Sequence, residues 1–143
     1  MFWVILGILF LFLGLDELLR IHEKIGQATS KVLDTSGIFY YAWIIPYVSV
    51  LLILSFLLLR PFLQLPASTR NGFMMAGGLF VLGAVGLEMI SGWYEDTYNI
   101  ADYNLYRTLP IFFMYTVEEL LEMIGVTYFI YVLIKFIERY STR

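Results

Sequence analysis

The residues of this 143-residue chain that could do chemistry are acids set in or beside apolar runs. Seven carboxylic acids and the single histidine make up the set: Asp16, Glu17, His22, Glu23, Glu88, Glu118, Glu119 and Glu122. Oxygen-rich sites of this kind suit hard or intermediate cations. Several like charges in one low-dielectric interior cannot all stay ionised without compensation, so a cation, protons or a water-filled vestibule must offset them.

Helical spacing brings several of these acids onto common faces. Glu118 and Glu122 are four residues apart, and Glu119 and Glu122 are three apart, so they are neighbours on one helix surface. On a regular helix, one face holds small or apolar residues and ends in an acid: Gly77, Val81, Ala84 and Glu88. A stripe of small residues permits close helix contact, which predicts an inward-facing acid at its end.

The expected chemistry is therefore a carboxylate-rich metal centre. Soluble di-iron bundles combine Glu with Glu-x-x-His pairs, whereas Glu119-x-x-Glu122 has the same spacing with Glu as its second ligand. We expect one divalent ion (Fe, Mn, Mg or Ca). The expected ligands are Glu23, Glu88, Glu119 and Glu122, with His22 and Asp16 or Glu17 completing or supporting the shell. No catalytic residue can be assigned.

The composition describes the environment of these residues. Hydrophobic residues make up 60% and charged residues 15% of the chain, and the mean hydropathy is +0.78. Soluble domains carry about 25% charged residues, so a water-soluble domain is disfavoured. The net charge of −3 excludes a strongly basic nucleic-acid binder, and the absence of cysteine excludes disulfides, thiolate metal sites and a cysteine nucleophile.

Four hydrophobic segments predict an all-α integral membrane four-helix bundle, a single transmembrane domain over residues 1–143. The spans are expected at about 2–25, 38–59, 72–94 and 109–134. The unbroken apolar run 2–15 would cover only about 21 Å of the ~30 Å hydrocarbon core, so the first helix should continue through the charged residues 16–23. The alternative is that it stops near Leu15 and those charges lie at the surface.

Loop charges predict the orientation. Arg60 and Arg70 bound a loop without acids, whereas Glu95 and Asp96 follow the third span. The positive-inside rule then puts both termini in the cytoplasm and the acid cluster toward the non-cytoplasmic side. Three aromatic residues that open the second span are expected to be interfacial anchors: Tyr40, Tyr41 and Trp43.

Four segments also carry a resemblance to known proteins: LDELLRIHE (15–23), RPFLQLP (60–66), LFVLGAVGLEMISG (79–92) and TVEELLEMIG (116–125). The chain resembles, over most of its length, an uncharacterised family of small bacterial integral membrane proteins that includes cyanobacterial members. The resemblance implies four spans in a bacterial inner or thylakoid membrane. It marks six positions as signature residues: Glu17, His22, Glu23, Glu88, Glu119 and Glu122. It implies no activity.

Three functions follow as hypotheses. The first is a membrane-embedded metal-binding protein, which as an enzyme would be an oxidoreductase or hydrolase acting on a lipophilic small molecule. The second is a proton- or cation-binding transport or sensing protein, for which a site open to one side fits better than a conduit. The third is an accessory subunit that binds other membrane subunits within the lipid bilayer.

Overall fold

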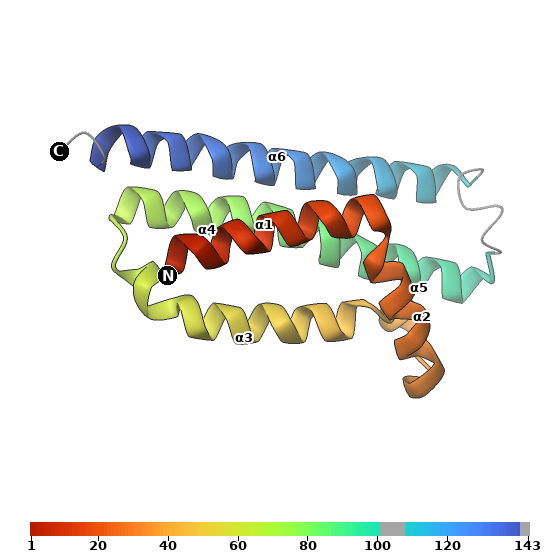
Figure 1. Ribbon diagram of the computed structural model, residues 1–143. Helices are drawn as coiled ribbons and strands as arrows, with labels where there is room; N and C mark the ends of the chain where they lie inside the picture. The colour runs from red at the N-terminus through yellow and green to blue at the C-terminus, as the bar shows by residue number, and fades with distance from the viewer. Residues whose placement is uncertain (101–107, 141–143) are drawn as a thin grey trace.

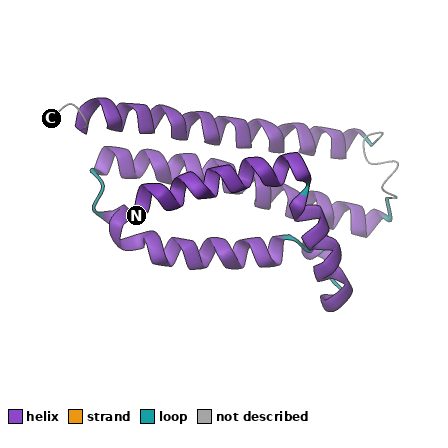
Figure 2. Cartoon of the chain, in the orientation of Figure 1, coloured by secondary structure: helices purple, strands orange, loops and turns teal. Residues whose placement is uncertain are grey.

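The computed structural model describes residues 1–100 and 108–140, and within these ranges the chain forms helices and no strand (Figures 1 and 2). In chain order the elements are α1 (Phe2–Leu19), α2 (Ile21–Leu33), η1 (Gly37–Phe39), α3 (Ile44–Leu63), α4 (Ala67–Val81), η2 (Leu82–Leu87), α5 (Glu88–Tyr98) and α6 (Leu109–Tyr140). The loop 101–107 and the tail 141–143, whose charged residues also bear on the predicted orientation, lie outside the described residues.

Four helices are long and apolar enough to cross a membrane, which confirms the number of spans predicted from the sequence. They are Phe2–Leu19, Ile44–Leu63, the continuous Ala67–Tyr98 and Leu109–Arg139. Large apolar side chains cover their outer faces, such as Leu52 (65% exposed) and Phe56 (79% exposed). Such apolar faces suit contact with lipid, and between its ends each helix pairs its own backbone polar groups.

Figure 1 shows the four long segments side by side, with the start of α1 and the end of α6 at one end and α2 at the other. The closest packing joins α4 and η2 to α6, where Phe73 stacks on Phe129 with ring centroids 4.4 Å apart. Glycines permit this approach. A Cβ on Gly125 would lie 2.9 Å from the Ala76 carbonyl oxygen, and one on Gly72 would lie 2.7 Å from Val132.

The first span differs from its expected extent of 2–25. Helix α1 ends at Leu19, and Arg20 takes a left-handed conformation with φ of 50°, after which α2 turns away from the long helices (Figure 1). The 18 residues of α1 already span about 27 Å, close to the thickness of the hydrocarbon core. The charged stretch 16–23 therefore does not have to continue the crossing. It contains the break between α1 and α2 and is named the hinge below.

The third span contains one turn of π-helix, η2, directly before Glu88. This wider turn interrupts the regular periodicity that placed Gly77, Val81, Ala84 and Glu88 on one face. A Cβ on Gly77 would meet nothing within 4 Å, whereas one on Gly83 would lie 2.9 Å from the Glu118 carbonyl oxygen. The small-residue contact thus runs through Gly83, and π-turns of this kind occur frequently at functional sites.

Candidate functional site

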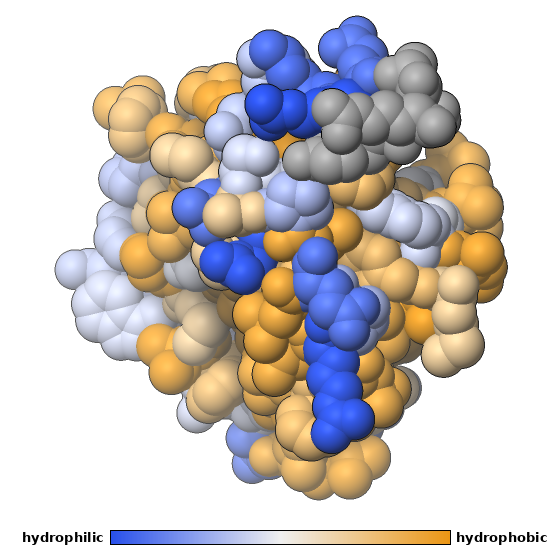
Figure 3. Space-filling model, turned by 90° about the vertical axis from the view of Figure 1, so that its left-hand side faces the viewer, coloured by the Kyte–Doolittle hydropathy of each residue, from blue (hydrophilic) through white to orange (hydrophobic). Residues whose placement is uncertain are grey.

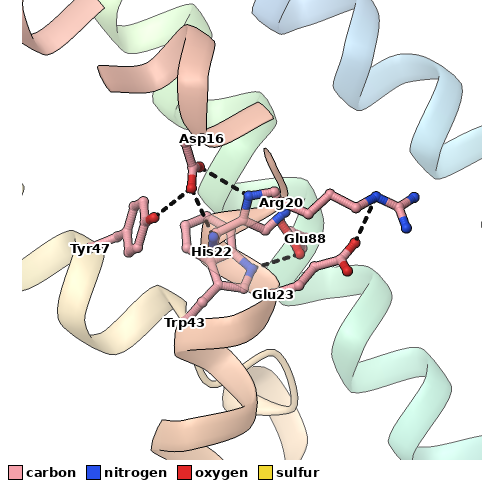
Figure 4. Close-up of polar contacts among 7 residues, drawn as sticks. All are labelled: Asp16, Arg20, His22, Glu23, Trp43, Tyr47 and Glu88. Atoms are coloured by element: carbon pink, nitrogen blue, oxygen red, sulfur yellow. Dashed lines mark hydrogen bonds and ion pairs between the residues drawn. The ribbon is translucent and has the colours of Figure 1, made fainter. Parts of the chain in front are cut away.

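The hinge between α1 and α2 is organised around Asp16, which is 7% exposed (Figure 4). Its Oδ1 accepts the backbone N–H of His22 at 2.8 Å and the hydroxyl of Tyr47 at 2.7 Å. Its Oδ2 lies 3.0 Å from Nδ1 of His22, and this nitrogen donates in the tautomer that carries hydrogen on Nδ1. Asp16 therefore caps the start of α2 across the break and fixes the His22 ring.

Trp43, at the start of α3, ties this hinge to the third span. Its Nε1 donates a hydrogen bond to Oε1 of Glu88 at 2.8 Å (Figure 4). Its ring meets those of His22 and Tyr47 edge-on, with centroids 5.5 and 5.1 Å apart. Helix α2 comes close to it at Gly26, where a Cβ would lie 3.3 Å from the Trp43 backbone nitrogen.

Glu95 on α5 is a second buried acid that accepts a tyrosine hydroxyl. It is only 2% exposed, and its Oε1 accepts the Tyr41 hydroxyl at 2.6 Å. Burial and the Glu95 carboxylate raise the pKa of the Tyr41 hydroxyl above its ordinary value, so this hydroxyl remains a donor. Next to it, Asp96 accepts the backbone N–H of Gly37 at 2.7 Å, which attaches η1 to α5.

Sequence reasoning missed this use of Glu95, which it placed in an acidic loop. The signal was available, because Glu95 follows Glu88 by seven residues, two helical turns, and so lies on the same face. Ser91 and Gly92 between them are buried on that face as well. Tyr41 and Trp43, which were expected to be interfacial anchors, also donate hydrogen bonds to Glu95 and Glu88.

The three glutamates of α6, all half-buried, present a different environment. Glu118 interacts electrostatically with Glu88 and Glu17, and Glu122 interacts with Glu119 and Glu17. Glu88 in turn interacts with Glu122. Within residues 1–100 and 108–140, no hydrogen bond or ion pair joins the side chains of Glu118, Glu119 or Glu122 to another residue. The interacting residues Glu17, Glu88, Glu118, Glu119 and Glu122 are named the acid cluster below.

The structure thus separates the residues that were expected to share one metal shell. Asp16 and His22 bind each other. Glu23 lies outside the cluster, 47% exposed, and pairs with Arg20 at 3.4 Å (Figure 4). Glu88, Glu119 and Glu122 remain in the acid cluster with Glu17. Across the described part of the chain, no group of three or more His, Asp or Glu residues is arranged to hold a metal ion.

The interior acids differ in the hydrogen-bond donors that contact them. Asp16 receives an uncharged donor from Tyr47 in the first turn of α3, and Glu95 and Glu88 receive one each from Tyr41 and Trp43 just before α3. The acids of α6 receive none among the described residues.

Comparison with known proteins agrees with the sequence resemblance only at the level of the family. No curated protein and no solved structure matches the chain. A family model matches residues 1–136, a range that includes every residue of the hinge and of the acid cluster. The chain therefore belongs to a family described as a domain of unknown function, DUF8692.

Proposed function

We propose that this chain is an integral membrane protein that binds a positive charge, a proton or a hard cation, in the acid cluster around Glu88, and that the site opens to one side of the membrane. The observation that carries the proposal is the meeting of acids from α1, α5 and α6, which interact with one another and have no cationic partner among the described residues. Charged groups inside a membrane are costly, and they mark binding or relay sites when they are retained.

A one-sided site fits the rest of the spans better than a conduit does. Beyond the acids, each span is uncharged toward the opposite end: residues 2–15, 44–59, 71–87 and 123–134 contain no Asp, Glu, Lys or Arg. An ion crossing the molecule would meet that apolar stretch without a compensating group. Binding or sensing therefore agrees with the sequence pattern, and the positive-inside rule assigns the acid cluster to the non-cytoplasmic side, with both termini in the cytoplasm.

A divalent metal is the second form of the same proposal. Carboxylate oxygens favour Mg²⁺, Ca²⁺, Mn²⁺ or Fe²⁺ over softer ions, so Glu88, Glu119 and Glu122 remain the candidate ligands. Glu23 and the Asp16–His22 pair are engaged elsewhere in this structure. The proton has the stronger support, because a proton needs one carboxylate and no preformed shell.

The test measures carboxyl protonation in the full chain reconstituted into lipid vesicles. Infrared difference spectra between acidic and neutral pH report the C=O stretch of protonated carboxyls. We expect this band to lose intensity in Glu88→Gln and Glu122→Gln and to persist in Glu23→Gln, the matched control with an exposed, paired carboxylate. Gln retains an acceptor oxygen for Trp43, so the hydrogen bond to α3 survives in Glu88→Gln.

Elemental analysis of the same samples separates the two forms. Stoichiometric metal that is lost in Glu122→Gln and retained in Glu23→Gln would assign the site to a metal ion. Equal metal in all samples, with the infrared change confined to the two cluster variants, supports the proton. Spectra and metal contents that do not differ between wild type and either cluster variant would overturn the proposal.

A further inference from the structure

A groove lies at the end of the molecule opposite the acid cluster, between the first turn of α4 and the last turns of α6. Hydrophilic side chains stand among hydrophobic ones on this end of the molecule (Figure 3). Val132 of α6, 8% exposed, forms part of its apolar lining. The polar residues that line it are Ser68, Thr69, Lys135, Glu138 and Arg139.

Thr69 is the most informative of these residues. It is 5% exposed and lines the groove, yet its hydroxyl makes no hydrogen bond with any described residue. Two other helical threonines differ in this respect: the hydroxyls of Thr29 and Thr116 donate to carbonyls four residues earlier, each within 2.8 Å. Because Thr69 lines the groove and its hydroxyl has no partner among the described residues, that hydroxyl is available to a ligand in the groove.

The backbone of α4 adds donors at the same place. The helix begins at Ala67 after Pro66, and no side chain of its N-cap residue caps it. The amides of its first turn therefore lack helical acceptors, and the positive end of the helix dipole lies beside Thr69. Helix N-termini of this kind bind phosphate and other anions.

Two cations complete the donor set from the facing helix. Lys135 and Arg139 are one turn apart on α6, and the Lys135 ammonium lies 5.2 Å from the centre of the Tyr131 ring. Glu138 also lines the groove, so two positive charges against one negative leave a formal charge of +1. Hydroxyls, helix amides and cations together form a donor set for an anion, with an apolar lining beneath it.

We propose that this groove binds a phosphate group, supplied either by the headgroup of an anionic phospholipid or by free inorganic phosphate. The chemistry follows from the donors: Arg and Lys bind phosphate oxygens through charge-assisted hydrogen bonds, and the Thr69 hydroxyl and first-turn amides supply neutral ones. Basic pockets between membrane helices bind lipid headgroups in this way.

The experiment uses the full chain in a neutral detergent and measures ligand retention by native mass spectrometry and thermal stabilisation. The probes are phosphatidylglycerol, phosphatidylcholine and inorganic phosphate. We expect phosphatidylglycerol to bind about tenfold or more weakly when Lys135→Gln and Arg139→Gln are combined, since each surface cation contributes about fivefold. The double variant Lys24→Gln with Lys31→Gln is the matched control, because it removes the same charge from α2 and should bind as wild type does.

Thr69→Val and Thr69→Ser isolate the hydroxyl. We expect Val to weaken binding and Ser to restore it, a contrast that bulk charge attraction does not produce. Preference for phosphatidylglycerol over inorganic phosphate assigns the site to a lipid, and equal stabilisation by both assigns it to the phosphate group alone. Equal binding by wild type and the Lys135/Arg139 double variant, or equal losses in both double variants, would overturn the proposal.

Discussion

Replacing Tyr47 with Phe tests whether neutral donors stabilise the interior acids. The substitution removes one oxygen and leaves the ring in place, so it abolishes the 2.7 Å hydrogen bond from the Tyr47 hydroxyl to Asp16 and preserves the packing of the ring against Trp43. Hydrogen bonds to charged groups contribute about 1.5–3 kcal/mol. Asp16 retains two donors from His22, so we expect the free energy of unfolding to fall by about 1.5 kcal/mol, at the lower end of that range.

The assay is equilibrium unfolding of the purified chain in mixed micelles, followed by near-ultraviolet circular dichroism, which reports tertiary packing of aromatic residues. Tyr98→Phe is the matched control, since Tyr98 is 62% exposed and its hydroxyl makes no hydrogen bond with a described residue. Substitutions of that kind stay within about 0.5 kcal/mol. A loss for Tyr47→Phe no larger than the loss for Tyr98→Phe would refute the idea that the donor from α3 stabilises Asp16.

Three further predictions concern the backbone and pH. Gly83→Ala should destabilise the chain by about 1–3 kcal/mol, because the added Cβ would lie 2.9 Å from a carbonyl oxygen of α6. Gly77→Ala should be neutral or stabilising, because its Cβ would meet nothing within 4 Å. Equilibrium unfolding in mixed micelles compares the two variants. Arg20→Gly should raise or preserve stability in the same assay, since glycine adopts a φ of 50° without strain, and a clear loss would contradict this. The pKa of Tyr41 is raised in the folded chain, so its contribution to the free energy of unfolding is complete below its unfolded pKa of about 10 and is lost as the pH rises further. The free energy of unfolding, measured against pH, should therefore fall less steeply above that value in Tyr41→Phe than in wild type.

The sequence predicts the spans well because hydrophobic length is a local property. Four apolar segments of sufficient length can be identified without any knowledge of packing, and in the structure each forms a helix long and apolar enough to cross a membrane. The break at Arg20 is different. It depends on a left-handed arginine and on Asp16, which caps the amide of His22 six residues later. Neither hydrophobic periodicity nor segment length carries a signal of that interaction.

The π-turn before Glu88 shows the same limit. Assigning faces at 100° per residue assumes a regular helix, and η2 shifts every later position relative to Gly77. The contact through Gly83 arises because α6 approaches there, with the Glu118 carbonyl against the glycine. Small residues in the sequence indicate that a close contact exists, but the partner helix decides which of them makes it.

The acids illustrate why a count of formal charges does not predict which acids share an environment. A charge count finds many carboxylates with few cations and expects an ion to join them all. The structure offers Asp16, Glu88 and Glu95 donors from uncharged Tyr and Trp side chains, which carry no sign in such a count. Because a hydrogen bond to a carboxylate stabilises its charge without neutralising it, these donors hold acids in place. The repulsion that remains is concentrated between Glu88 and the acids of α6, and that is where a proton or cation would gain the most by binding.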